Sequence, residues 1–228
     1  MRWHDRRGPA KRAREQPLAT SLDPQVRETP GAATGASKPR PPSSARSHRS
    51  GRHDFAFRPP EPGDAAEVWR IARDSGALDL NSPYFYLILC SDFADTCLVA
   101  ERRGALVGFL AAYRPPARKD VVFVWQIAVA AEARGSGLAT ELLTTLLERP
   151  GVRDVRQLEA SVTPGNRASR RLFEGFARRR GAACREAPLY GAELFPAEAG
   201  SHEPEILLRI GPLERAEPRI DSRTTRGG

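Results

Sequence analysis

The 228-residue sequence lacks the features of a membrane protein and of a disulfide-stabilised protein. It has no run of about 18 consecutive apolar residues, the length that a membrane-spanning helix needs, so we expect no transmembrane protein. Its three cysteines, Cys90, Cys97 and Cys184, are odd in number and include no C-x-x-C pair, which excludes a disulfide scaffold and a zinc ribbon. No group of His, Cys and acidic residues has metal-ligand spacing, so we predict no bound metal. This composition fits a cytoplasmic protein.

Lysine is also scarce, since only three of the 36 basic residues are Lys and the rest are Arg. The net charge of +8 is confined to one end of the chain. Residues 1–53 hold 12 Lys and Arg against 4 Asp and Glu, whereas residues 54–228 hold 24 of each kind. A folded nucleic-acid surface needs excess basic charge to neutralise phosphates, so we predict no nucleic-acid partner.

Residues 1–53 have a single aromatic, Trp3, together with seven prolines and no apolar periodicity. Such a segment buries too little apolar surface to offset the entropy of ordering it, which predicts a disordered, basic, Arg/Pro/Ser-rich extension. It lacks the apolar stretch of a secretory signal, and its four acidic residues argue against an organellar transit peptide. We expect the folded domain at residues 54–213 and a polar, frayed tail at 214–228.

From Phe55 onwards the pattern is that of one α/β domain with a mixed sheet. Asp64 and Glu67 follow Pro62-Gly63 in the positions of a capping box and predict the start of a helix. Strands at 96–101 and 105–113 flank Arg103-Gly104, which is typical of a hairpin. The apolar run Val121–Val129 predicts a central strand buried on both faces. The other expected elements are a leucine-striped helix at 138–147, a strand at 155–162, a short helix at 166–176 and a strand at 206–210.

The most informative segment follows the central strand, where Arg134-Gly135-Ser136-Gly137-Leu138-Ala139 precedes the leucine-striped helix. A glycine-containing turn at a helix start presents free backbone N–H groups and the positive end of the helix dipole, which together favour an anion. Gly135 and Gly137 let the backbone approach phosphate oxygens closely. The Walker and Rossmann patterns both fail here. An ordinary tight turn that opens a helix is the alternative interpretation.

The six residues Arg134–Ala139 resemble the R-x-x-G-x-A motif of the GCN5-related N-acetyltransferases (GNAT), and Asn166-Arg167-Ala168-Ser169 through Phe173 is similar to a later motif of that superfamily. The resemblance covers about residues 55–212. It implies a mixed, mostly antiparallel central sheet flanked by helices, with acetyl-CoA as co-substrate. It further implies that the pyrophosphate contacts Arg134, Gly135, Ser136, Gly137, Leu138 and Ala139, that Asn166 and Ser169 lie at the pantetheine arm, and that Ile127 and Val129 belong to the cofactor strand.

Three further segments resemble the L-2,4-diaminobutyrate N-acetyltransferases of ectoine biosynthesis, a branch of that superfamily. They are Leu78–Leu87, Phe123–Val129 and His202–Pro212. The resemblance implies acetylation of the 4-amino group of L-2,4-diaminobutyrate, a step of compatible-solute synthesis, by a homodimer. Acetylation of another small diamine or amino acid by the same fold is one alternative. A non-catalytic acyl-CoA-binding module is the other.

The same resemblance places four residues at the substrate pocket: Asp79, Tyr84, Trp125 and Glu205. Their chemistry suits a substrate with two ammonium groups and one carboxylate, because carboxylates pair with ammonium groups and aromatic faces attract cations. The amine, with a pKa of about 10, has to lose a proton before it attacks the thioester. A backbone N–H near Ile127–Val129 would stabilise the oxyanion that develops.

The proton donors and acceptors stay unassigned. Phe173 lies where many relatives have a Tyr that acts as general acid, so water, Tyr84 or another tyrosine is left to protonate the thiolate. Glu159 is either a base or half of a structural ion pair, and we favour the ion pair. We expect His202 to have a structural role.

Overall fold

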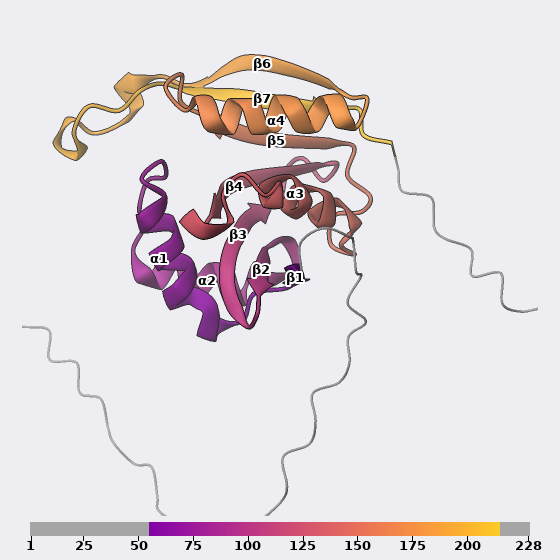
Figure 1. Cartoon of the computed structure of the whole chain (residues 1–228). Helices are drawn as coiled ribbons and strands as arrows, with labels where there is room; N and C mark the ends of the chain where they lie inside the picture. Colours follow the sequence, from indigo (N-terminus) through magenta and orange to yellow (C-terminus); the bar gives the residue numbers. More distant parts are fainter. Residues whose placement is uncertain (1–54, 215–228) are drawn as a thin grey trace, which may run out of the picture. The chain divides into compact units, whose positions relative to one another are not determined.

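The computed structural model of the chain describes residues 55–214, which fold around a seven-stranded sheet (Figure 1). The strand order is β1-β2-β3-β4-β5-β7-β6. β4 and β5 pair in parallel and all other neighbours pair antiparallel, so the predicted mixed, mostly antiparallel sheet is confirmed. The predictions for residues 1–53 and for residues 215–228 lie outside the described part. The strands are β1 Phe55–Arg58, β2 Leu98–Arg102, β3 Ala105–Tyr113, β4 Val121–Val129, β5 Gln157–Val162, β6 Ala183–Tyr190 and β7 Glu205–Gly211.

Helices cover both faces of this sheet (Figure 1). On one face α1 (Ala65–Ser75) and α2 (Pro83–Ser91) pack on a cluster that includes Val99, Phe109 and Ala128. On the other face α3 (Leu138–Glu148) and α4 (Arg167–Arg179) pack on a larger cluster. The leucine stripe predicted for α3 is the buried face of that helix, with Leu138, Leu142, Leu143, Leu146 and Leu147 all buried. The described residues thus form the predicted single domain.

The hairpin and the central strand have the predicted positions. Arg103 and Gly104 turn from β2 to β3 with φ values of 55° and 81°, the left-handed pair that a two-residue hairpin requires. β4 has the predicted bounds and lies in the middle of the sheet. Its burial on both faces holds for Val121–Val124 only, because Trp125 is 41% exposed.

The start of α1 differs from the prediction. The capping box is formed by Glu61 and Asp64 around the short 3-10 helix η1 (Pro62–Asp64), and Asp64 and Glu67 do not form one. Pro62 occupies the first helical position, where its missing N–H costs nothing, and this moves the cap one turn towards the N-terminus. Glu67 instead pairs with Arg70 on the exposed face of the helix.

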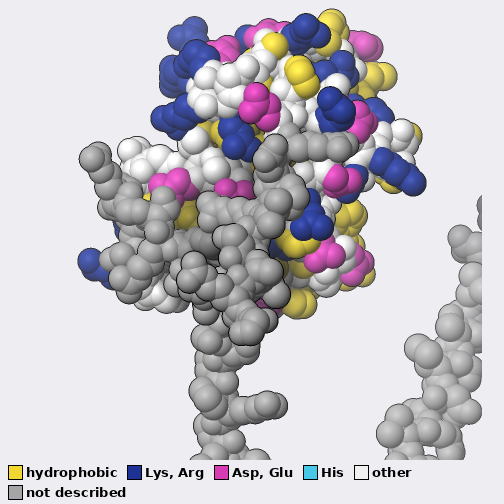
Figure 2. All heavy atoms as spheres, turned by 90° about the vertical axis from the view of Figure 1, so that its right-hand side faces the viewer, with side chains coloured by type: hydrophobic (Ala, Val, Ile, Leu, Met, Phe, Trp, Pro, Cys, Tyr) yellow, Lys and Arg dark blue, Asp and Glu magenta, His cyan; other side chains and the backbone are white. Residues whose placement is uncertain are grey.

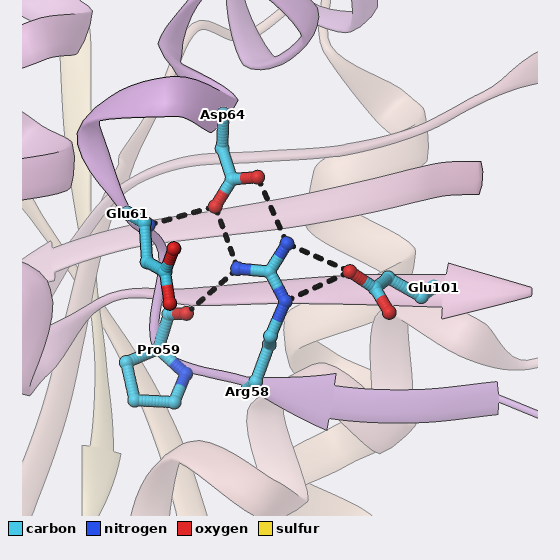
Figure 3. A network of polar contacts seen from close by, with 5 residues as sticks. All are labelled: Arg58, Pro59, Glu61, Asp64 and Glu101. Atoms are coloured by element: carbon cyan, nitrogen blue, oxygen red, sulfur yellow. Dashed lines mark hydrogen bonds and ion pairs between the residues drawn. The ribbon is translucent and has the colours of Figure 1, made fainter. Parts of the chain in front are cut away.

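A polar network ties this helix start to the edge of the sheet (Figure 3). The Arg58 guanidinium on β1 donates to both oxygens of Asp64, at 2.6 and 2.8 Å, and through Nε to Glu101 on β2 at 2.8 Å. Asp64 also accepts from the Glu61 N–H at 2.7 Å. The hydrogen bond from Arg58 holds the pKa of Asp64 below its ordinary value, against the opposing effect of burial. The network therefore joins β1, η1 and β2.

The surface carries charges of both signs. On the face shown in Figure 2, Lys and Arg side chains (dark blue) and Asp and Glu side chains (magenta) both occur among apolar ones. Within residues 55–214, no helix has the length and hydropathy to cross a bilayer.

Candidate active site

The strands β4 and β5 are paired along only part of their length. Their parallel register runs from Val121↔Gln157 to Val124↔Ala160, and no pairing of the two strands is found beyond that point in the described residues. At the same point β4 has a bulge against β3, because Ala112 faces Val124 and Ala111 faces Gln126. Trp125 is the extra residue of that bulge. The second half of β4 thus has one edge directed towards β5 without being paired to it.

The N–H groups of Ile127 and Val129 point to this edge. Ala130 N–H donates to Val107 of β3 at 2.9 Å, and successive N–H groups of an extended chain alternate between its two edges. The N–H of Ala128 therefore faces β3, whereas those of Ile127 and Val129 face β5. The carbonyl of Val129 points to the same edge as its N–H, and there it accepts from Arg134 Nε at 3.3 Å.

The predicted anion loop lies between β4 and α3. Gly135 and Gly137 have φ values of 75° and 88°, and Gly137 is the N-cap of α3. A Cβ at either glycine would meet no protein atom within 4 Å. The space beside the loop is therefore open, and the first-turn amides of α3 lie next to it, as a phosphate site needs.

Side chains of the same loop fix its shape. Ser136 Oγ donates to the Ala133 carbonyl at 2.7 Å and accepts from Leu138 N–H at 3.4 Å. Arg134 also reaches the carbonyl of Asp74 at the end of α1, at 3.3 Å. Leu138 is buried beneath the loop, and Ala139 is half-buried in the first turn of α3. Ser136 and Arg134 hold the loop through their own contacts, and its backbone is left to face a ligand.

Asn166 and Ser169 lie together at the start of α4. Asn166 is the N-cap, and its Oδ1 accepts from Ser169 N–H at 3.0 Å. Its amide NH₂ group is not used by this cap, and the residue lines the cavity described next. Asn166 thus combines a capping role with a position at the site.

A cavity of about 270 Å³ opens beside the unpaired edges of β4 and β5. It is lined by residues of the loop after α1, of β4, of the end of β5 and of the segment before β7. Four of the residues predicted from the sequence line it: Asp79, Trp125, Asn166 and Glu205. Tyr84 does not, because it lies in the first turn of α2 with 70% of its surface exposed. The role predicted for Tyr84 stays a prediction.

The cavity is acidic. Asp79, Glu203 and Glu205 line it together with His202. Burial raises the pKa of Glu205, while a hydrogen bond with Ser161 and the charge of His202 act in the opposite direction. Carboxylates in this arrangement favour a cationic ligand.

His202 and Glu203 were not selected as site residues from the sequence. His202 Nδ1 lies 2.5 Å from the carbonyl oxygen of Glu203, and Nε2 lies 3.3 Å from Asp79 Oδ2. The Glu203 carbonyl, and then Asp79, raise the pKa of His202. Glu203 Oε2 accepts from Gly165 N–H at 2.9 Å. The signals in the sequence are their place just before Glu205 and their position in the family-like segment His202–Pro212.

Gln126 is a further cavity residue that the sequence reasoning missed. It is 4% exposed, accepts from the Tyr86 hydroxyl at 3.1 Å and donates from Nε2 to the Asp79 carbonyl at 2.8 Å. It therefore connects the loop that carries Asp79 to β4. The sequence signal for Gln126 is an amide inside an otherwise apolar strand.

Trp125, the neighbour of Gln126, packs edge-to-face on Phe85 of α2, with ring centroids 4.4 Å apart.

Glu159 and Phe173 lie away from the cavity. Glu159 is fully buried and pairs with Arg118 and, at 2.8 Å, with Arg209 Nε, which confirms the predicted ion pair. Phe173 is buried in the core under α4. Among residues 55–214, no three His, Cys, Asp or Glu side chains are grouped so that they could hold a metal ion.

Known proteins are similar to this chain in sequence and in fold. Residues 63–176 match the acetyltransferase (GNAT) family. The L-2,4-diaminobutyric acid acetyltransferase of Nocardia farcinica is 48% identical over 157 residues, which are 69% of this chain and 80% of that protein. The enzyme of the same name from Marinococcus halophilus is 43% identical over 161 residues, 71% of this chain and 92% of that protein.

A solved structure of diaminobutyrate acetyltransferase EctA from Paenibacillus lautus, in complex with its substrate L-2,4-diaminobutyric acid and coenzyme A, superposes with a TM-score of 0.68. It is 42% identical, and the match covers 73% of this chain and all of that one. The predicted GNAT-type fold is therefore confirmed. With relatives of this identity and coverage, the chain belongs to the GNAT family and, within it, to the L-2,4-diaminobutyric acid acetyltransferases.

Proposed function

We propose that this protein transfers the acetyl group of acetyl-CoA to the 4-amino group of L-2,4-diaminobutyrate, a step of ectoine biosynthesis. The observation that carries the proposal is the acidic cavity beside the unpaired edge of β4, in a chain more than 40% identical to diaminobutyrate acetyltransferases. The cavity brings the carboxylates of Asp79 and Glu205 to the unpaired edge of β4 and to Asn166. A non-catalytic module would need neither the carboxylates nor their position beside that edge.

The cofactor is assigned to the loop and to β4. The pyrophosphate lies on the amides of residues 134–139 at the N-terminus of α3, where the helix dipole adds to the backbone donors. The pantetheine arm runs along the free edge of β4 towards Asn166 and Ser169. This path brings the thioester carbonyl to the N–H groups of Ile127 and Val129, which point towards β5.

The substrate is assigned to the cavity. Asp79 and Glu205 offer carboxylates to its two ammonium groups, and Trp125 offers an aromatic face. The substrate has eight heavy atoms, and a cavity of about 270 Å³ holds a molecule of that size. Removing either carboxylate would leave a partly desolvated ammonium without a partner.

The reaction proceeds by direct attack of the free amine on the thioester. The oxyanion that develops accepts a hydrogen bond from a β4 N–H group, which is pre-oriented by the sheet. No cysteine takes part, since none of Cys90, Cys97 and Cys184 lines the cavity. Cys90 and Cys97 are also buried in the cluster under α1 and α2, and burial raises the pKa of their thiols to about 12 and about 11.

The test is a thiol-release assay with acetyl-CoA and four amines in parallel: L-2,4-diaminobutyrate, ornithine, lysine and spermidine. We expect the highest kcat/KM with diaminobutyrate. The extra methylene of ornithine is worth about 1–3 kcal/mol by itself and also moves the amine away from the thioester. Equal turnover of ornithine and diaminobutyrate would support acetylation of a broader set of small diamines. Coenzyme A binding without turnover of any amine would support the binding module.

We also infer that the protein is a cytoplasmic homodimer. Tyr84 and Leu87 lie three residues apart on α2, so they share a face, and they are 70% and 43% exposed. Exposed apolar neighbours are typical of an interface. The three free cysteines suit a reducing compartment. Light scattering of the wild type and of a Tyr84→Arg/Leu87→Arg variant tests the dimer, and we expect the variant to be monomeric.

A further inference from the structure

We propose that His202 is the general base that takes the proton from the substrate amine; the proposal rests on the acetyl transfer proposed above. His202 lines the cavity between Asp79 and Glu205. It comes from the segment before β7, and Asp79 from the loop after α1, 123 residues earlier in the chain. The reaction needs a base at this place, because the amine is protonated at neutral pH.

The contacts of the ring define which nitrogen is the base. Nδ1 lies 2.5 Å from the carbonyl oxygen of Glu203. A carbonyl oxygen only accepts, so the hydrogen of the neutral imidazole resides on Nδ1. In this neutral form Nε2 carries the lone pair, so it donates to Asp79 Oδ2, 3.3 Å away, only after it has taken up a proton. The backbone thus selects the tautomer that can accept a proton from a bound ammonium.

The ring is also fixed in orientation. Phe195 stacks on it with ring centroids 3.7 Å apart and an interplanar angle of 10°. This stacking and the Nδ1 hydrogen bond restrict both torsions of the side chain before a substrate arrives. A base held in this way needs no reorganisation at the moment of proton transfer.

The groups around His202 make its imidazole a stronger base. Asp79 faces it from the loop after α1 and Glu205 from β7, while the Glu203 carbonyl faces Nδ1 from its own segment and Phe195 contributes no charge. The carbonyl of Glu203 and the carboxylate of Asp79 raise the pKa of His202 above its ordinary value. A stronger base accepts a proton from an ammonium more readily, and deprotonated imidazole still forms as the pH rises.

The two cavity carboxylates are better suited to binding than to proton transfer. At their ordinary values a carboxylate is a weaker base than an imidazole by about two pKa units. Burial narrows this difference for Glu205, whose pKa is raised, but the same cavity contacts raise the pKa of His202 as well. Asp79 is 85% exposed at its side chain, and Glu205 is engaged with Ser161. Both carboxylates stabilise the ammonium form, which is the form that binds but does not react.

The proton balance closes with His202 in this role. One N–H proton of the 4-ammonium passes to Nε2, and the nitrogen lone pair forms the C–N bond with the thioester carbon. The C–S bond breaks, and the thiolate leaves with the second N–H proton as the coenzyme A thiol. His202, whose side chain is 21% exposed, returns its proton to solvent.

The experiment compares the pH dependence of kcat for diaminobutyrate in the wild type and in His202→Gln, with His202→Asn as a second variant. In the wild type we expect kcat to fall tenfold per pH unit on the acidic side of the His202 titration. In His202→Gln we expect kcat at pH 7.5 to drop by about 10²–10⁴-fold, as for loss of a general base. We expect its KM for diaminobutyrate to change by less than tenfold and its acetyl-CoA affinity to stay at the wild-type value.

In the variant the acidic limb should no longer follow the His202 titration. Its kcat should instead rise with pH towards pH 10, where the amine is free without a base, so its deficit should shrink. A purely structural role would lower the melting temperature and leave the shape of the profile unchanged. Either variant with a folded melting curve, near-wild-type kcat and an intact acidic limb would overturn the assignment. If the wild type itself fails to acetylate diaminobutyrate, the proposed function fails, and that result is distinct from failure of His202 as the base.

Discussion

Replacing Gly137 with Val tests the cofactor loop, because the chain offers a matched control at Gly104. The two glycines have φ values of 88° and 81°, and a Cβ at either one would meet no protein atom within 4 Å. Both replacements therefore introduce the same backbone strain and no steric clash within the protein. They differ in place: Gly137 is the N-cap of α3, and Gly104 is in the β2–β3 turn.

The strain of a side chain in the left-handed region is about 1–2 kcal/mol. In a domain of this size it lowers the melting temperature by about 2–8 °C. We expect this loss in both Gly137→Val and Gly104→Val. At Gly137 alone the new side chain also occupies the open space beside the loop amides. The loss of one hydrogen bond to a charged phosphate, worth about 1.5–3 kcal/mol, weakens acetyl-CoA binding by about 10–150-fold.

The assay is calorimetric titration of acetyl-CoA into both variants, together with their melting curves. Wild-type affinity in Gly137→Val would refute the pyrophosphate assignment. An equal loss of affinity in Gly104→Val would show that strain, and not the blocked space, is the cause. Only a loss confined to Gly137→Val supports a phosphate on this loop.

Three other perturbations have defined outcomes. Asp79→Asn and Glu205→Gln keep the shape and remove the charge, so each should lower kcat/KM for diaminobutyrate about 30-fold or more and leave acetyl-CoA affinity unchanged; unaffected kinetics in both would contradict the substrate assignment. Asp64→Asn should lower the free energy of unfolding, measured with urea at pH 7, by about 2 kcal/mol, since it weakens the hydrogen bonds to Arg58. Because the pKa of Asp64 is lowered in the folded state, the difference in unfolding free energy between wild type and variant should persist above the ordinary pKa of Asp64. It should vanish as the pH falls through the folded-state pKa, and a pH-independent difference would refute the linkage. Deletion of residues 1–53 should leave melting temperature and turnover unchanged, and a large loss of either would contradict the predicted extension.

The elements that the sequence predicts well are those whose pattern is local. Val121–Val129 is a continuous apolar run, and Leu138–Leu147 repeats leucine at helical spacing, so period alone identifies both. The β2–β3 turn has the residues that a left-handed pair requires. In each case the chemistry of a few neighbours decides the structure.

Three elements were not predicted, each for a physical reason. α2 (Pro83–Ser91) is apolar nearly throughout, so it has no polar face to reveal a helical period. β6 is an exposed edge strand with Pro188 inside it, and β1 is a four-residue edge strand. Edge strands receive their order from a neighbour that is distant in sequence, which a local pattern does not contain.

The site residues, too, divide into those that a local sequence pattern predicts and those that depend on contacts distant in sequence. The anion loop follows from glycines at the start of a helix, whereas the substrate residues Asp79 and Glu205 were placed by resemblance to a family. The sequence predicts a structural role for His202, whereas in the structure it contacts Asp79, which lies 123 residues earlier in the chain. A contact between residues so far apart in sequence is set by the sheet topology. A single histidine before a strand does not predict it.

The bulge at Trp125 explains why Gln126 in particular escaped sequence reasoning. Strict alternation along β4 would place Gln126 on the same face as Val124, against α3 and α4. The extra residue reverses the alternation, so Gln126 faces the other side, where it meets the Tyr86 hydroxyl and the Asp79 carbonyl. The same reversal turns Trp125 into the cavity and leaves the edge of β4 unpaired beside β5. One inserted residue, which no hydrophobic pattern records, thus produces the opening in the sheet and the acidic cavity beside it.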